Sequence, residues 1–148
     1  MKIYVAADHN GFDYKSRLLE QLKHFGYEAV DAGDTKINPD DDFPQFAARA
    51  VRQLLADKDD ASRAVLVCGS GQGMAIAANR FKGIRASLCW NLAEARAARN
   101  DDNSNVLCLS VQNTSLKEAE SILQTWLQTP FAGASRFVRR IRELDRLP

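Results

Sequence analysis

The sequence predicts an α/β protein with a Rossmann-like three-layer fold: a five-stranded parallel sheet, helices on both faces and a C-terminal helix. Five short apolar runs alternate along the chain with segments whose apolar residues recur at helical spacing. This alternation is typical of parallel strands joined by crossover helices. The length of 148 residues matches one domain, and no linker or internal repeat divides it. We therefore expect a single domain over residues 1–148.

The N-terminal part of the chain predicts a strand, a helix, a second strand and a loop. The apolar run 2–7 predicts the first strand, and the helical spacing of apolar residues predicts a helix over 12–25. Gly26 suits the end of that helix, and residues 27–30 form a second strand-like run. The polar stretch 31–42 predicts a loop.

The middle of the chain predicts a helix, a buried strand and a second helix. Pro44 suits the first turn of a helix over 44–56. After a charged connector, the run 64–67 is apolar and rich in β-branched residues, which predicts a strand buried on both faces. Residues 74–79 favour a helix.

The C-terminal part continues the alternation after a break at Lys82 and Gly83. The apolar runs predict strands over residues 85–90 and 106–109. Helical patterns predict helices over residues 93–99, 116–127 and 134–147, the last of which is basic.

Charge and composition exclude several classes of protein. The net charge of +1 gives no bulk attraction to nucleic acid or to a membrane surface. No segment reaches the apolar length of a membrane span, and the first apolar run is too short for a signal peptide. Cys68, Cys89 and Cys108 lie in or beside apolar runs, which suits reduced thiols. We expect a cytoplasmic protein that binds no nucleic acid, membrane or metal.

The stretch from Cys68 to Gly73 has the strongest functional signal. Glycines at positions 69, 71 and 73 join a buried strand to a helix, and backbone N–H groups in such a turn can hold an anion. Cys68 ends the strand, where a nearby helix N-terminus is expected to lower the pKa of its thiol, and Ser70 adds a hydroxyl. The alternative is structural: glycines that only permit tight packing, beside a buried cysteine.

Two further polar groups are candidates for the same site. Asp8 and His9 follow the first predicted strand, and a polar loop over 100–103 follows a predicted helix. Ligands of parallel sheets bind at the carboxyl ends of the strands, so we expect both groups to meet Cys68 at that edge. The alternative for His9 is a cap on the next helix.

Two charged stretches also have two interpretations each. Arg136 and Arg140 share one face of the last predicted helix, where two guanidinium groups suit a phosphate clamp. A solvated basic helix end is the alternative. The aspartates at 40–42 predict a solvated loop with one residue capping the following helix.

These residues together resemble the type B ribose-5-phosphate isomerases and the related galactose-6-phosphate isomerase subunits. The resemblance covers essentially the whole chain. It rests on Asp8-His9-x-Gly11, Asp42-Phe43-Pro44, Cys68-Gly-Ser-Gly-x-Gly73 with Ile-Ala-Ala-Asn79-Arg80, Gly83-Ile-Arg85-Ala86, Arg99 before the polar loop, Asn105-Val-Leu107, and Arg136-x-x-x-Arg140.

The resemblance implies aldose–ketose isomerisation of a sugar phosphate, without metal or organic cofactor, in a homodimer or tetramer whose sites are shared between subunits. Cys68 matches the base, Ser70 a proton shuttle, and backbone N–H groups of the glycine turn would hold an enediolate oxygen. The implied catalytic residues are Cys68, Ser70 and Asp101. The implied substrate-binding residues are Asp8, His9, Asp42, Gly69, Gly71, Gln72, Gly73, Arg99, Asp102, Arg136 and Arg140.

The sequence departs from the family at positions that bear on the substrate. Asp101 and Asp102 stand where the family has a His–Asn pair, whose histidine assists furanose ring opening. Gln112 stands in place of an arginine that helps bind phosphate, and Phe137 replaces a common histidine. We hypothesise an open-chain or differently sized aldose phosphate, such as a tetrose 4-phosphate. The alternative is that Asp101 has taken over ring opening.

A function of another class is a catalytically silent or ligand-binding paralogue of the same fold. Loss of the histidine and of one arginine is what such a paralogue would display. The retained Cys68, Ser70 and glycine turn favour the enzyme. The glycine spacing does not match the dinucleotide-binding fingerprint.

Overall fold

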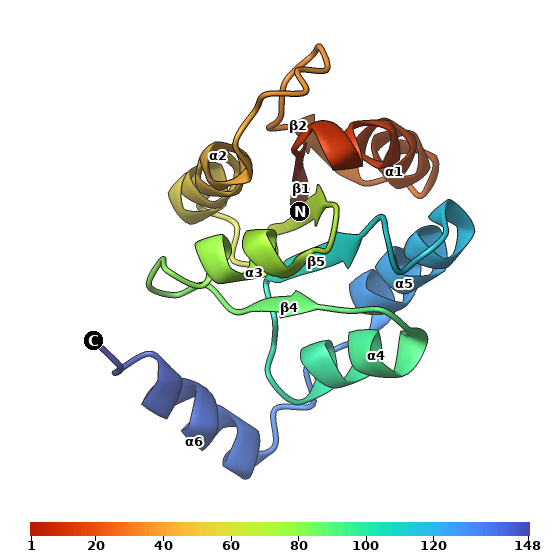
Figure 1. The fold of residues 1–148 in the computed structure, drawn as a ribbon. Coiled ribbons are helices and arrows are strands. Elements are labelled where there is room, and N and C mark those ends of the chain that lie inside the picture. Colours follow the sequence, from red (N-terminus) through yellow and green to blue (C-terminus); the bar gives the residue numbers. More distant parts are fainter.

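The computed structural model describes residues 1–148 and confirms the predicted fold (Figure 1). Five parallel strands form one sheet in the order β2-β1-β3-β5-β4. The strands are β1 (Lys2–Ala7), β2 (Glu28–Asp31), β3 (Arg63–Cys68), β4 (Ala86–Leu88) and β5 (Val106–Ser110). The helices are a single 3-10 turn η1 (His9–Gly11), α1 (Phe12–His24), α2 (Phe43–Ala56), α3 (Gln72–Ala78), α4 (Leu92–Asn100), α5 (Leu116–Gln128) and α6 (Ser135–Leu144).

Different helices cover the two faces of the sheet (Figure 1). Helices α1, α4 and α5 pack on one face, where Val65 and Val67 of β3 join a buried apolar cluster. Helices α2 and α3 pack on the other, where Leu66 and Cys68 join a second cluster. Strand β3 is therefore buried on both faces, as its apolar run predicts. Cys68 belongs to the face that α2 and α3 cover.

The order of the strands reverses between β1 and β3. The chain leaves β1 toward the face of α1 and leaves β3 toward the face of α3, so the two connections diverge. Their carboxyl ends stay adjacent, because Ala7 pairs with Val67 and the N–H of Asp8 donates to the carbonyl of Val67 at 3.3 Å. A Cβ atom at Gly11 would lie only 2.6 Å from that carbonyl oxygen, so this close approach requires glycine. Ligands of open parallel sheets bind at such a switch point.

Two element lengths differ from the prediction by three residues or more. β4 is an edge strand of three residues rather than the predicted six, because its pairing with β5 ends at Leu88. On its free side, the side chain of Asn79 bonds both the N–H and the carbonyl of Ala86 at 2.9 Å. This amide takes the place of a further strand. The last helix ends at Leu144 rather than Leu147, and Asp145 caps it.

Helix α6 stands apart from the layered body (Figure 1). Phe137 is its one buried residue, while Val138, Ile141 and Leu144 continue the same apolar stripe with partial or full exposure. A helix of this kind lacks the packing that normally stabilises an amphipathic helix. None of the helices has the length and apolar character that crossing a membrane requires.

Candidate active site

The turn between β3 and α3 is built around Cys68. Its side chain is almost buried, and its Sγ accepts the N–H of Gly71 at 3.2 Å. Gly71 has a φ of +75°, and a side chain there would collide with Leu88 and with the backbone of Leu109. Tight packing thus requires glycine at position 71, as the structural alternative for the turn predicts.

The pKa of the Cys68 thiol is raised, whereas the sequence predicts that it is lowered. Burial is the main cause, and the negative charge of Asp8 adds to it. The N–H groups of Met74, Gly71 and Ser70 act in the opposite direction by stabilising the thiolate. The predicted effect of the turn is thus present, but removal of the thiol from water outweighs it.

Strand β5 fixes the same turn from the other side. The carbonyl of Gly69 accepts the hydroxyl of Ser110 at 2.9 Å and the N–H of Gln112 at 3.0 Å. The amide groups of Gln112 and Asn10 flank Gly69, 3.1 and 3.5 Å from where a Cβ would stand. Gln112, predicted from its position as a replacement for an arginine, therefore lies beside the turn as a neutral amide.

The remaining groups of the turn are a hydroxyl and an aromatic ring. The Oγ of Ser70 accepts the N–H of Gln72 at 3.3 Å, which keeps the hydroxyl beside the turn. The ring of Phe43, the first residue of α2, lies directly beside Gly73. Asp42 occupies the cap position of α2, but its side chain makes no capping bond and is exposed.

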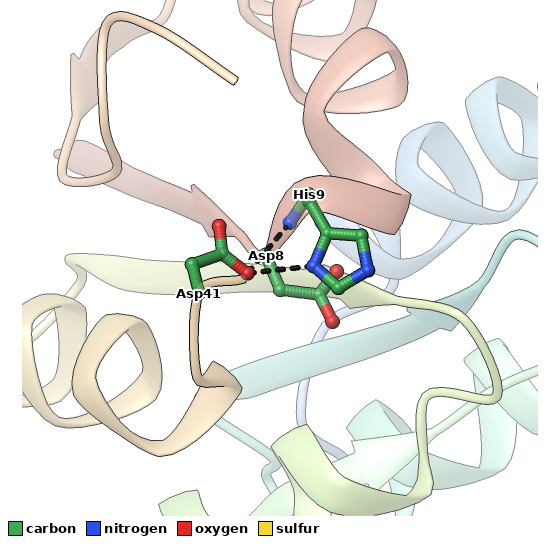
Figure 2. Close-up of side chains that lie close together, drawn as sticks. All are labelled: Asp8, His9 and Asp41. Atoms are coloured by element: carbon green, nitrogen blue, oxygen red, sulfur yellow. Dashed lines mark hydrogen bonds and ion pairs between the residues drawn. The ribbon is translucent and has the colours of Figure 1, made fainter. Parts of the chain in front are cut away.

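Asp8 and His9 begin the segment that follows β1. Asp8 is buried, and its Oδ1 accepts the N–H of Gly11 at 3.1 Å, so it caps the 3-10 turn. The Nδ1 of His9 lies 2.7 Å from Oδ1 of Asp41 (Figure 2). His9 does not cap α1, whose cap position is Gly11. The sequence prediction of a solvated loop is wrong for Asp41, whose side chain is 8% exposed.

One ligand atom each from Asp8, His9 and Asp41 lies within 4.8 Å of the others, which is a spacing that suits a cation. Nδ1 of His9 is hydrogen-bonded to Oδ1 of Asp41, and Oδ1 of Asp8 accepts the N–H of Gly11. Hydrogen bonds within the protein therefore hold these three side chains in place.

The loop over 100–103 lies at the amino ends of the strands, whereas Cys68 lies at their carboxyl ends. The prediction that this loop meets Cys68 is therefore wrong within one chain. It follows a helix rather than a strand, and α4 returns the chain to the amino ends of the strands. Asn105 there accepts the N–H of Ala64, the residue that follows the start of β3. Asp101 is half-buried and accepts the amide of Asn100, while Asp102 is exposed.

Arg99 lies at that same amino edge and is buried. Its Nη1 donates to Oδ1 of Asn103 at 2.8 Å and to the carbonyl of Ser104 at 2.6 Å, and its guanidinium lies over the ring of Trp126. Burial, with the charges of Arg63 and Arg85, lowers its pKa to about 10. Within one chain Arg99 holds the loop that carries Asp101 and cannot reach a ligand at Cys68.

Helix α6, with Arg136 and Arg140, is attached to the amino edge as well. The N–H of Ala132 donates to the carbonyl of Asn100, and Arg85 lies 3.9 Å from Asp145 at the end of α6. Both predicted phosphate ligands are exposed. The predicted site residues thus form two groups, one at the carboxyl ends of the strands and one at their amino ends.

Comparisons with known proteins agree with this architecture. Residues 3–144 match the model of the Ribose/Galactose Isomerase family. Ribose-5-phosphate isomerase B of Mycobacterium tuberculosis is 36% identical over 141 residues, covering 95% of this chain and 86% of that protein.

Solved structures agree as well. Ribose-5-phosphate isomerase B of Mycoplasma genitalium, crystallised with bound ribulose-5-phosphate, has a TM-score of 0.93 at 35% identity, covering 98% of this chain and 94% of that one. The enzyme of Thermotoga maritima has a TM-score of 0.92 at 39% identity, covering 99% and 98%.

The fold, together with these comparisons, defines an isomerase of sugar phosphates. More particularly, the chain belongs to the Ribose/Galactose Isomerase family, among relatives named ribose-5-phosphate isomerase B. The predicted family is confirmed.

Proposed function

We propose that the protein interconverts an aldose phosphate and its ketose through an enediolate, with Cys68 as the base. The observation that carries the proposal is the position of Cys68 at the strand switch point, beside a turn of backbone N–H groups. The bound ribulose-5-phosphate of the Mycoplasma genitalium relative favours a pentose 5-phosphate as substrate.

The proposed steps conserve protons and electrons. The Cys68 thiolate takes the proton from C2 of the open-chain aldose. The electrons of the C2–H bond form the C1–C2 double bond, and the π electrons of the C1 carbonyl move to O1. Backbone N–H groups of the turn stabilise the negative oxygen. The Ser70 hydroxyl passes the proton of O2 to O1, the O2 carbonyl forms, and the Cys68 thiol returns its proton to C1.

The pH dependence of this reaction has two opposing limbs. The base must be a thiolate, and since the pKa of Cys68 is raised, its ionised fraction grows with pH into the alkaline range. In the proposal, phosphate is held by the His9 imidazolium, whose pKa is also raised and which loses its charge as pH rises. Turnover and phosphate binding therefore respond to pH in opposite directions.

We further propose that the enzyme is a homodimer, or a tetramer of such dimers, whose sites are shared between subunits. The predicted residues at the amino edge, Asp101, Asp102, Arg136 and Arg140, are exposed or half-buried, and α6 presents an unpartnered apolar stripe. A two-fold related second chain would bring this edge to the Cys68 turn of the first. Arg99 then contributes by holding the loop of Asp101.

Subunit mixing tests the shared site. Cys68→Ala and Arg140→Ala should each be nearly inactive, whereas a mixture refolded together should regain about a quarter of wild-type activity, because half of the random dimers contain one intact site of two. The measurement is the isomerase rate before and after mixing. A mixture no more active than its components contradicts the shared site, and a mixture of Cys68→Ala with itself is the control.

The reaction itself is tested by deuterium exchange in heavy water, followed by proton NMR, with tetrose, pentose and hexose phosphates. Exchange at the carbon beside the carbonyl is expected to be fastest with ribose 5-phosphate if Asp101 assists ring opening, and with a tetrose 4-phosphate if it does not. Asp101→Ala should then slow the pentose but not the tetrose in the first case. If folded protein causes no deuterium exchange into any of these sugars, the result would indicate the catalytically silent paralogue.

The proposed compartment is the cytoplasm. Cys68, Cys89 and Cys108 are all free and buried, and burial raises the pKa of Cys89 to about 12. A catalytic thiol must stay reduced, which a reducing compartment provides.

A further inference from the structure

Asp41 and His9 meet although 32 residues separate them in the chain. Oδ1 of Asp41 accepts from His9 twice, from the backbone N–H at 3.1 Å and from the ring at Nδ1 at 2.7 Å (Figure 2). The Asp41 side chain is 8% exposed, whereas Asp40 and Asp42 beside it are exposed. One of three consecutive aspartates is thus directed inward, to His9, the second residue after β1.

The loop that carries Asp41 is held by contacts of its own. At its start, Nζ of the buried Lys15 donates to both carboxylate oxygens of Asp31 and to the carbonyl of Asp34. At its end, the N–H of Asp41 donates to the carbonyl of Asn38, and α2 begins two residues later. The fold therefore fixes the place of the Asp41 carboxylate before any ligand binds.

The contact determines which ring nitrogen of His9 carries a proton. A carboxylate accepts hydrogen bonds, so Nδ1 must be the donor, and Nε2 is the nitrogen left for a ligand. The bond to the His9 backbone fixes the side from which Asp41 approaches the ring. Orientation and protonation of the ring thus depend on one carboxylate.

We propose that Asp41 is a positioning residue that orients the His9 ring for the phosphate of the substrate. The inference rests on the proposed function, in which His9 binds phosphate. Asp41 acts through His9 and has no contact with the reacting carbons in this proposal. The Asp41 carboxylate and the His9 ring form an ion pair when the ring is protonated, and such hydrogen bonds are stronger than neutral ones.

The charged groups that act on His9 are all acidic. The hydrogen bond to Asp41 is the largest cause of the raised pKa of His9, and the charges of Asp8, Asp41 and Asp40 add to it, while partial burial opposes them. With a raised pKa, the ring keeps its charge to a higher pH than a free imidazole. Anion binding that needs this charge is therefore present at low pH and is lost as pH rises through the raised pKa of His9.

A histidine titration by NMR tests the contact without any ligand. His9 and His24 are the two histidines of the chain, so two ring signals are expected, and His24 serves as an internal control. Asp41→Asn should lower the pKa of His9 toward the free value, because it removes the hydrogen bond and the charge that raise it. Asp40→Asn is the matched control from the same loop and should change it little. Equal pKa values of His9 in the two variants would overturn the proposal.

Sulfate binding tests the consequence, because sulfate keeps its charge across the range. The wild-type protein and Asp41→Asn should bind sulfate similarly at pH 5.5, and the variant more weakly at pH 7.5, by up to tenfold for each pKa unit that His9 loses. In turnover, the variant should raise KM more than it lowers kcat, and Asp41→Glu should restore part of the difference.

The two measurements separate the possible failures. An unchanged pKa of His9 in Asp41→Asn overturns the role of Asp41, whatever the enzyme binds. A lowered pKa with unchanged sulfate affinity at pH 7.5 overturns the phosphate-binding role of His9 and with it the positioning role. A lowered pKa together with pH-dependent loss of sulfate supports both.

Discussion

Replacement of Cys68 by serine is expected to lower kcat by about 10²- to 10⁴-fold, the usual contribution of a general base. The hydroxyl is close to the thiol in size and can still accept the N–H of Gly71, so the turn should keep its shape. Its much higher pKa leaves it protonated, and it can no longer take the proton from the sugar. The measurement is the rate of deuterium exchange into the sugar, with circular dichroism as the check on folding.

Cys89→Ala provides the matched control. Cys89 is also a free, buried thiol with a raised pKa, but it lies on the opposite face of the sheet, under α4. Its removal should leave kcat unchanged within about twofold, because it meets no group of the site. A Cys68→Ser enzyme that keeps more than a tenth of the wild-type rate would assign the base to another residue.

The pH profile distinguishes a base from a merely structural thiol. Burial raises the pKa of Cys68, so the wild-type kcat should increase with pH through neutrality as the thiolate forms. The residual rate of Cys68→Ser should lack this limb. A thiol that only packs the turn would leave the shape of the profile the same in both proteins.

The sheet was predictable from local pattern, because its three central strands, β1, β3 and β5, are short apolar runs that the structure buries. The run at β3 is continuous, and the structure buries it on both faces. β4 was predicted too long because its last residues are apolar, whereas its pairing with β5 ends at Leu88. The amide of Asn79 bonds Ala86 on the free edge of the strand, in place of a further strand. Side chains that replace a strand leave no periodic signal.

The site was predictable only where its parts are adjacent in sequence. Cys68 and the glycine turn form one local motif, and the switch point that makes them a site follows from strand order. The Asp41–His9 contact joins residues 32 positions apart, and nothing in a run of three aspartates distinguishes the one that turns inward. The direction of α4 decides that Asp101 lies at the far edge, which the predicted helix before it already implied.

The largest expected change in stability comes from the ion pair that holds the loop of Asp41. Asp31→Ala should lower the free energy of unfolding by about 3 kcal/mol, the lower end of the range for a broken buried pair, because only Lys15 is fully buried. Lys15 is 1% exposed, so the variant leaves its ammonium group buried, with the carbonyl of Asp34 as the remaining hydrogen-bond acceptor and the Phe12 ring 5.0 Å away. Urea unfolding at pH 7 measures the loss.

Lys15→Met removes the same ion pair but should be much less destabilising, by about 1 kcal/mol or less, because it removes the buried charge as well. The methionine fills most of the volume, and Asp31, whose side chain is 37% exposed, is left in contact with water. The two variants therefore separate the energy of the pair from the penalty of an unpaired charge. Equal losses would mean that the attraction itself, and not desolvation of Lys15, dominates.

Either variant loosens the start of the loop, so the pKa of His9 should fall in both if Asp41 depends on that anchor.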